Sequence, residues 1–319
     1  MTNPLPLILM LSLAGIAVYL IAATLLALLL LKPPRMTDGK AIYLLGRLTP
    51  ADLGFTFQPV SFNVRDHATG RPLKVAAWWI PAGAPSDRCV VLLHGRADAK
   101  VGAIAWAPML RNLGWNILVP DMRAHGESDG RFSTAGVHER YDVDQVINQI
   151  QAQFPQQTRT LVLVGLSMGA GIALGVAGIR TDIAGLVLDS PFCSYAQATW
   201  EHMKLMAFDI RPLHRAAIAI AERLAGCRFD DMIPVKLLAE VSCPVLLIDG
   251  DDDPLIPPAG REQLQQALAT RSGRGLCTHR WSAPGTGHLQ AYVCHPQEYE
   301  RRISEFLETA LRSLPGRPA

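Results

Sequence analysis

Short, continuously apolar runs recur through the central and C-terminal parts of the sequence, and amphipathic stretches separate most of them. A run without polar alternation is typical of a strand buried on both faces. The stretch 137–154 between two runs places Val143, Val146, Ile147 and Ile150 on one helical face. This alternation predicts an α/β fold with a mostly parallel, doubly wound sheet and helices on both faces. The runs are 89–93, 115–119, 161–164, 186–188 and 245–248, with a last strand at 278–282.

The sequence before and between these runs sets the expected domain boundaries. Residues 60–65 and 73–80 flank a turn at 66–70 and predict an antiparallel hairpin that opens the sheet. The chain has 319 residues, enough for one large α/β domain, which we expect at 59–319 after a linker at 36–58. Residues 191–240 interrupt the alternation and predict a helical cap over the site.

The N-terminal segment is the most apolar part of the chain. Residues 5–31 contain no charged side chain and exceed the roughly 20 residues that span a bilayer, so we expect a transmembrane anchor at 1–35. A cleaved signal peptide is the alternative, but the first four residues lack its basic region. All nearby basic side chains follow the apolar segment, which predicts a single-pass membrane protein with its catalytic domain in the cytoplasm. They are Lys32, Arg35, Lys40 and Arg47.

Charge and cysteine content exclude several classes of function. The formal net charge is +2 and no long basic block occurs, so we expect no nucleic-acid partner. The six cysteines are scattered, without a C-x-x-C pair or a Cys/His cluster, and are therefore interpreted as small core residues. A Cys277–Cys294 disulfide is possible. The sequence predicts neither a metal site nor a bound organic cofactor, and it leaves the oligomeric state open.

A strand, a sharp turn and a helix are expected around Ser167. The apolar run 161–164 leads into Gly165-Leu-Ser167-Met-Gly169, and an Ala/Leu-rich segment follows. In G-x-S-x-G the glycines permit a tight bend that exposes the serine hydroxyl next to a helix N-terminus. The same glycines, with Gly171 and the later Asp189, also fit a turn that binds a dinucleotide pyrophosphate. This window alone leaves both interpretations open.

Four loops that follow predicted strands can decide between them, because the carboxyl ends of parallel strands share one edge of the sheet. A Gly-containing turn at 94–97 follows the first apolar run, and a polar loop at 120–130 follows the second. An acidic turn at 249–257 and a glycine loop that carries His288 follow the last two strands. A serine, an acid and a histidine then occur in the chain order of an α/β-hydrolase triad.

From about residue 60 onward, the sequence resembles the α/β-hydrolase fold serine hydrolases of the monoacylglycerol-lipase-like, serine-aminopeptidase-like and acyl-thioesterase-like group. One departure is Ala124, where the family loop usually has glycine. The dinucleotide-binding interpretation is disfavoured, because the glycine turn of such a site should open the first βαβ unit, whereas several strands precede the turn at Ser167. The matching motifs are Leu93-His94-Gly95, Asp121-x-Arg123-x-His125-Gly126-x-Ser128, Gly165-x-Ser167-x-Gly169, Asp189-Ser-Pro-Phe192, Gly250-x-x-Asp253-x-x-Ile256-Pro257 and Gly287-His288.

The resemblance implies a role for each site residue. Ser167 is the expected nucleophile, His288 the general base and then acid, and Asp253 the carboxylate that orients the imidazole. Asp189 is the second candidate for the acid. The expected oxyanion-hole donors are the backbone N–H groups of Met168 and Arg96, so the Arg96 side chain is given no role.

These residues predict a serine hydrolase that cleaves a carboxylic ester or a thioester through an acyl-enzyme. The substrate is a small molecule or a lipid-derived acyl group, which suits an anchored domain with an apolar insertion. A peptidase or amidase of the serine-aminopeptidase type remains an alternative, because the same triad serves it. A non-catalytic interaction module of this fold is the alternative from another class. His94 and His125 are expected to be structural turn residues.

Overall fold

The computed structural model describes residues 4–312 of the chain, and an eight-stranded sheet forms its centre. The strand order is β1-β2-β4-β3-β5-β6-β7-β8. The pairs β1–β2 and β2–β4, at one end of the sheet, are antiparallel, and every other neighbouring pair is parallel. The strands are β1 (Gln58–Arg65), β2 (Pro72–Ile80), β3 (Arg88–Leu93), β4 (Asn116–Pro120), β5 (Thr160–Leu166), β6 (Ile183–Asp189), β7 (Val245–Gly250) and β8 (Thr278–Ala283).

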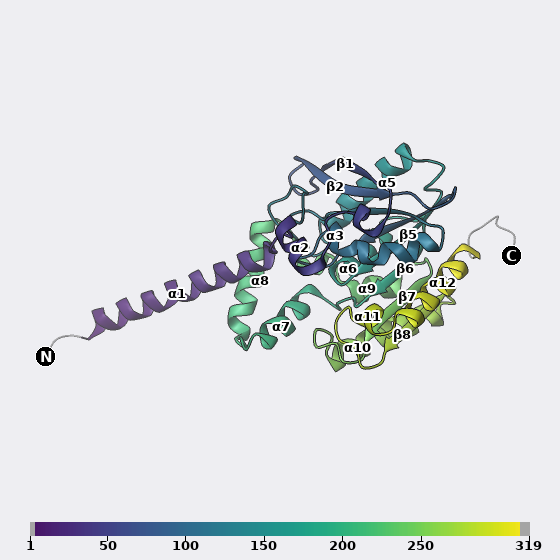
Figure 1. The fold of residues 1–319 in the computed structure, drawn as a ribbon. Coiled ribbons are helices and arrows are strands. Elements are labelled where there is room, and N and C mark those ends of the chain that lie inside the picture. The colour runs from purple at the N-terminus through teal and green to yellow at the C-terminus, as the bar shows by residue number, and fades with distance from the viewer. Residues whose placement is uncertain (1–3, 313–319) are drawn as a thin grey trace.

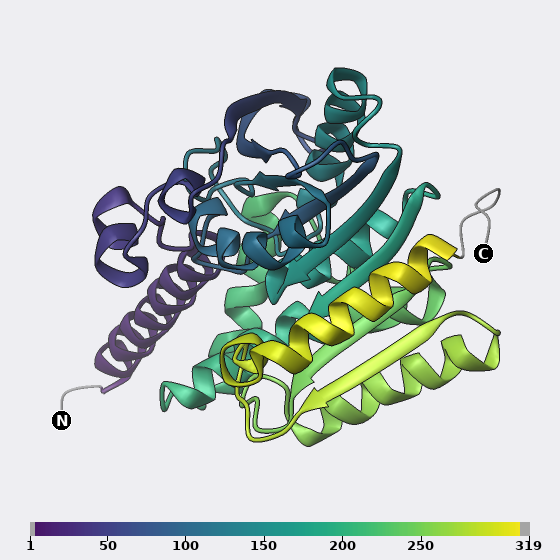
Figure 2. The ribbon, with the colours of Figure 1, turned by 45° about the vertical axis from the view of Figure 1, so that its right-hand side comes forward.

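Helices cover both faces of the sheet, and each face has its own core. Alternate residues of β3 point to opposite sides. Val91 belongs to the core that includes α5 (Glu139–Gln153), α6 (Met168–Ala177) and α10 (Pro258–Gly273), whereas Val90 belongs to the core that includes α4 (Ala107–Asn112) and α12 (Pro296–Arg312). Figure 2 shows α12 lying along the near face of the sheet. The predicted doubly wound α/β architecture is confirmed.

Short helices connect these elements at the edges of the sheet. The region after α1, where a linker is predicted at 36–58, contains α2 (Asp38–Leu45) and a 3₁₀ turn η1 (Pro50–Leu53). A short helix and a 3₁₀ turn, α3 (Lys100–Ala103) and η2 (Ile104–Trp106), precede α4, and α11 (Ala291–Cys294) precedes α12.

A helical insertion between β6 and β7 matches the predicted cap. It consists of α7 (Tyr195–Leu205), α8 (Arg211–Ala225), the 3₁₀ turn η3 (Phe229–Asp231) and α9 (Pro234–Glu240). Phe192, Tyr195 and Phe229 pack together and join the insertion to the core on the α6 side. The insertion therefore begins at the carboxyl edge of the parallel strands, the same edge at which β5 leads into α6.

The apolar N-terminal segment forms one long helix, α1 (Leu5–Leu31), which projects from the body (Figure 1). It is the one helix in the described residues with the length and apolarity needed to cross a membrane. Its C-terminal part packs against α8 and buries Ala23, Ala27, Leu30 and Leu31. The rest of the helix exposes large aliphatic side chains along most of its surface.

Each strand predicted from the sequence exists, with boundaries shifted by a few residues. The predicted 60–65 and 73–80 hairpin is the antiparallel β1–β2 pair. All six cysteines are free thiols, so the possible Cys277–Cys294 disulfide is not formed. The division into an anchor at 1–35, a linker at 36–58 and a catalytic domain at 59–319 stays a prediction.

Candidate active site

The turn between β5 and α6 holds Ser167 in a strained backbone conformation. Its φ of 53° and ψ of −110° are rare for a residue with a side chain, and such a residue costs of order 1–3 kcal/mol. Close packing makes this turn possible: a Cβ on Gly165 would lie 2.4 Å from the Gly169 carbonyl oxygen, and one on Gly169 would lie 2.1 Å from the Leu93 carbonyl oxygen. These contacts explain both glycines of G-x-S-x-G without a bound nucleotide.

Three predicted site residues form one hydrogen-bonded chain. The Ser167 Oγ lies 2.8 Å from Nε2 of His288, and Nδ1 of His288 lies 2.7 Å from Oδ2 of Asp253. The second Asp253 oxygen, Oδ1, accepts the Leu255 N–H at 2.8 Å. The Asp253 carboxyl is fully buried, whereas the imidazole retains 23% exposure. A carboxylate can only accept here, so the imidazole carries its proton on Nδ1 and offers Nε2 to the serine hydroxyl.

The predicted oxyanion-hole turn lies against the serine. A Cβ on Gly95 would be 3.5 Å from Ser167 Cβ, which places the 94–97 turn beside the nucleophile. Ala97 has φ 63°, so the backbone bends sharply directly after Arg96. Neither the Arg96 nor the Met168 N–H donates to a backbone carbonyl in the turns and loops of residues 4–312. Both groups remain available to an oxygen bound at Ser167.

Asp189, the second candidate for the acid, points into a different network. It is fully buried, and its two oxygens accept from Tyr299 Oη at 2.9 Å and Ser190 Oγ at 3.0 Å. Burial raises the Asp189 pKa to about 6, although both hydroxyl donors oppose this change. Ser190 Oγ in turn accepts the Leu289 N–H at 3.2 Å. Asp189 therefore supports the loop that carries His288 and does not contact the imidazole itself.

His94 and His125 have structural partners. The Nδ1 of His94 lies 2.7 Å from the Gly95 carbonyl oxygen, and its Nε2 accepts the Met122 N–H at 2.9 Å, so the ring joins two loops at the catalytic edge. His125 lies against it, with ring centroids 5.0 Å apart. Burial lowers the His125 pKa to about 3, so this ring is neutral at ordinary pH.

Asp121, in the same family motif, is also structural. It is fully buried and accepts from the Lys100 ammonium at 2.6 Å, the Lys100 N–H at 2.7 Å and the Glu127 N–H at 2.9 Å. The short helix that follows the 94–97 turn is thereby tied to the loop after β4. The motif thus encodes a scaffold around the turn beside Ser167.

Two arginines near the site have roles that the sequence does not reveal. The Arg96 guanidinium donates to the Leu29 carbonyl oxygen at 2.6 Å and to that of Leu30 at 3.3 Å, so it caps the C-terminus of α1. Arg35 donates to the Gly126 and Ser128 carbonyl oxygens at 2.7 and 2.8 Å. Both arginines connect the N-terminal segment to the loops around Ser167.

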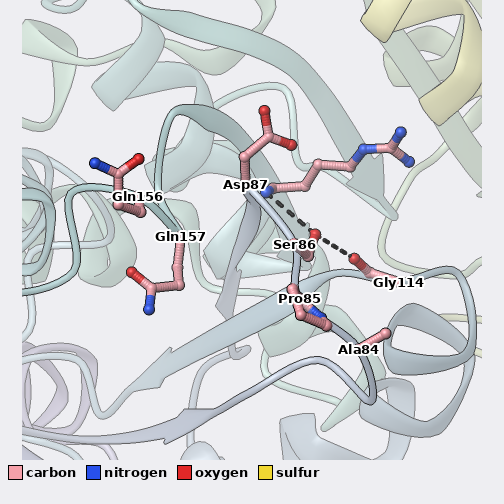
Figure 3. Close-up of a pocket in the computed structure, with 8 residues that line it drawn as sticks. Ala84, Pro85, Ser86, Asp87, Gly114, Gln156 and Gln157 are labelled. Atoms are coloured by element: carbon pink, nitrogen blue, oxygen red, sulfur yellow. Dashed lines mark hydrogen bonds between the residues drawn. The ribbon is translucent and has the colours of Figure 1, made fainter.

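A pocket of ≈ 630 Å³ lies far from these residues (Figure 3). It is bounded by Pro85, Gly114, Gln157 and the start of β3 at Arg88, and the Ser86 hydroxyl donates to the Gly114 carbonyl oxygen at 2.6 Å. The 94–97 turn follows the opposite end of β3. The pocket is therefore at the other edge of the sheet and takes no part in the candidate site.

Comparison with known proteins agrees with this geometry. Residues 84–226 match the family described as Serine aminopeptidase, S33. Among solved structures, the Pyrococcus furiosus esterase Pf2001 superposes with a TM-score of 0.69 at 24% identity, covering 87% of this chain and 97% of the esterase. The chain has the α/β-hydrolase fold. A Pyrococcus horikoshii acylaminoacyl peptidase shares the fold with a TM-score of 0.59 at 15% identity, covering 85% of this chain and 45% of the peptidase.

Two relatives by sequence extend the comparison. Protein YqkD of Bacillus subtilis is 27% identical over 233 residues, which cover 70% of this chain and 73% of YqkD. The lysophosphatidylserine lipase ABHD12 of Macaca fascicularis is 26% identical over 238 residues, covering 72% of this chain and 58% of the lipase. The chain is thus similar to α/β hydrolases of the esterase, lipase and serine-aminopeptidase group.

Proposed function

We propose that this hydrolase cleaves a carboxylic ester or thioester through an acyl-enzyme, with Ser167 as nucleophile, His288 as base and acid, and Asp253 as the orienting carboxylate. The observation that carries the proposal is the continuous chain from Ser167 Oγ through His288 to buried Asp253. A non-catalytic module of this fold has no physical need for all three groups in hydrogen-bond contact. The strained conformation of Ser167 likewise supports a catalytic role.

The chemistry follows from these positions. His288 Nε2 takes the hydroxyl proton as Ser167 Oγ attacks the acyl carbon, and Asp253 stabilises the imidazolium that forms. The N–H groups of Met168 and Arg96 would stabilise the negative oxygen of the tetrahedral intermediate. The imidazolium then protonates the leaving alcohol or thiol, which departs and leaves the acyl group on Ser167. Water, deprotonated by the same imidazole, releases the acid and restores the serine.

We propose a lipid-derived acyl chain as the substrate and α1 as a membrane anchor. The similarity to a lysophosphatidylserine lipase and the largely aliphatic exposed surface of α1 support both. Peptide or amide cleavage is the second candidate, and the match to the serine aminopeptidase family favours it. Comparing acyl esters, thioesters and aminoacyl amides on the full chain in detergent decides between them: the greater kcat/KM identifies the class.

Labelling by a fluorophosphonate probe tests the nucleophile. The full chain should be labelled, and Ser167→Ala should abolish labelling without lowering the melting temperature. Ser272→Ala, at an exposed position in α10, is the matched control and should be labelled like the wild type. Labelling that persists in Ser167→Ala would remove Ser167 from the mechanism.

The proposed orientation places the hydrolase domain in the cytoplasm, on the side of the basic residues that follow α1. Paired C-terminal fusions to a phosphatase, active only outside the cytoplasm, and to a fluorescent protein, fluorescent only inside, test this orientation. Fluorescence with no phosphatase activity is expected. The reverse pattern would place the domain outside.

A further inference from the structure

The segment that joins α7 to α8 exposes an unusual concentration of large apolar side chains. We call residues 205–210 the cap tip. Four of its six side chains are large, apolar and about half exposed or more: Leu205 (58%), Met206 (61%), Phe208 (55%) and Ile210 (49%). Single exposed apolar residues are ordinary, but a contiguous group of this kind marks a surface that binds something apolar.

The cap tip lies beside the part of α1 that projects from the body. The helices α1 and α8 are in extensive contact, and the Tyr19 hydroxyl donates to the Pro212 carbonyl oxygen at 2.8 Å. Pro212 follows the cap tip by two residues. The tip is therefore near the level of Tyr19, which precedes the C-terminus of α1 by twelve residues. Figure 1 shows the α7–α8 end of the cap on the side from which α1 extends.

The length of α1 determines where a bilayer would lie relative to this contact. A hydrocarbon core of about 30 Å requires about 20 residues at 1.5 Å rise per residue. Even if the core begins at Leu5, the first residue of α1, it extends to Thr24. Tyr19 is then five residues inside the boundary, about 8 Å deep. A tilted helix, or a core shifted toward the body, would place Tyr19 deeper.

The backbone of the first part of the cap tip, residues 206–208, is compatible with this depth. The N–H groups of Met206, Ala207 and Phe208 all donate to carbonyl oxygens of the last turns of α7. Satisfied donors are what an apolar medium demands, because an unpaired N–H group there costs several kcal/mol. Exposed Asp209 and Arg211 flank Ile210 and limit insertion to a depth from which their charged groups can reach the headgroups. The pattern is that of an element about 5–10 Å into the interface.

We propose that the cap tip inserts into the same bilayer leaflet that receives the C-terminal half of α1, so that the hydrolase contacts the membrane through its cap as well as its anchor. This inference rests on the proposed role of α1 as a membrane anchor. It adds a second lipid contact, within the insertion that begins at the catalytic edge.

Tryptophan quenching by brominated lipids tests the proposal on the full chain in vesicles. Phe208→Trp places a reporter in the cap tip, and Leu13→Trp, on the exposed surface of α1, reports whether α1 itself is embedded. Ile179→Trp is the matched control, because Ile179 is also exposed but follows the C-terminus of α6, the end remote from Ser167. The wild-type signal of six tryptophans is subtracted in each lipid.

The proposal predicts a loss of the added fluorescence for Phe208→Trp and Leu13→Trp in acyl-brominated vesicles, and no loss for Ile179→Trp. Quenching of Leu13→Trp without quenching of Phe208→Trp would overturn the inserted tip, leave the anchor intact, and indicate a tip that faces water, a protein or a second copy. If Leu13→Trp is also unquenched, the proposed membrane anchor and the proposed inserted tip are both contradicted. Neither result depends on catalysis, so Ser167 labelling is judged separately.

Discussion

Replacing Asp253 by asparagine should disable the proposed triad through the tautomer of His288. The two Asp253 oxygens have different partners: Oδ1 accepts the Leu255 N–H, and Oδ2 faces His288 Nδ1. An asparagine keeps its amide oxygen toward Leu255, because only an oxygen can accept there. Its NH₂ group then faces Nδ1 and requires that nitrogen to be unprotonated. The imidazole proton moves to Nε2, which can no longer accept the Ser167 proton.

The magnitude follows from losing both functions of the carboxylate. In Ser-His-Asp proteases the equivalent exchange lowers kcat about 10⁴-fold, or about 5.5 kcal/mol in activation free energy. The same loss is expected here because the Asp253 carboxyl is fully buried and no water can replace its charge. KM should change little, since Asp253 lies behind the imidazole and does not face the substrate.

Asp189→Asn provides the control of equal chemistry. Its neighbours Tyr299 and Ser190 are hydroxyl groups, which can reorient to accept from an NH₂ group, and neither contacts the imidazole. We expect kcat within about tenfold of the wild type, because hydroxyl rotors can absorb the change. Steady-state hydrolysis of a soluble aryl ester measures both variants. If Asp189→Asn loses about 10⁴-fold and Asp253→Asn does not, the assignment of the acid is refuted.

Three further predictions concern stability, each measured by unfolding in detergent. Gly169→Ala should cost several kcal/mol, since its Cβ would lie 2.1 Å from a backbone oxygen; Gly273→Ala, with open space at the end of α10, should be neutral or stabilising, and equal effects would contradict the packing argument. Asp121→Asn should cost about 3 kcal/mol, because it leaves the buried Lys100 ammonium with the exposed Glu127 as its one carboxylate partner, beside the Trp78 ring; a loss below about 1 kcal/mol would mean that the pair is not desolvated. Asp189 binds its proton more tightly in the folded state, with a pKa of about 6 against an ordinary 3.8, so its contribution to stability should decline by about 3 kcal/mol as the pH rises from about 4 to 6. Asp189→Asn should remove this decline, and an unchanged pH profile would contradict it.

The sequence was sufficient for the parts of the fold that depend on local pattern. Continuous apolar runs identify buried strands, and the order of strand, Ser167 turn and helix fixes where the elbow lies. Asp253 and His288 could be named because each lies in a short loop that directly follows a strand, where the sheet itself determines position. The elbow was ambiguous, because the atom that explains Gly169, the Leu93 carbonyl oxygen, lies on another strand.

The contacts that escaped prediction join a side chain to backbone carbonyl groups far along the chain. Arg35 reaches the loop at 126–130, and Arg47 donates to the Val101 and Gly102 carbonyl oxygens at 3.2 and 3.1 Å. Every residue offers the same carbonyl group, so no residue pattern marks the acceptor. In the sequence, Arg35 and Arg47 indicate only how the apolar segment before them is oriented in the membrane. Their contacts show that both also hold the catalytic body together.

The C-terminal end of α1 belongs structurally to the hydrolase as well as to the proposed anchor. A helix leaves its last carbonyl groups without internal partners, and Pro33 and Pro34 cannot donate to them. Here the body supplies the donors: Arg96 for Leu29 and Leu30, the Tyr195 hydroxyl also for Leu30, and the Ser133 N–H for Leu31. A fragment that begins at Lys40 would expose the apolar surface that Ala27, Leu30 and Leu31 cover, and it would remove the acceptors of Arg96 and Tyr195. The last turn of α1 is therefore part of the hydrolase core, and kinetic work on this protein requires the full chain.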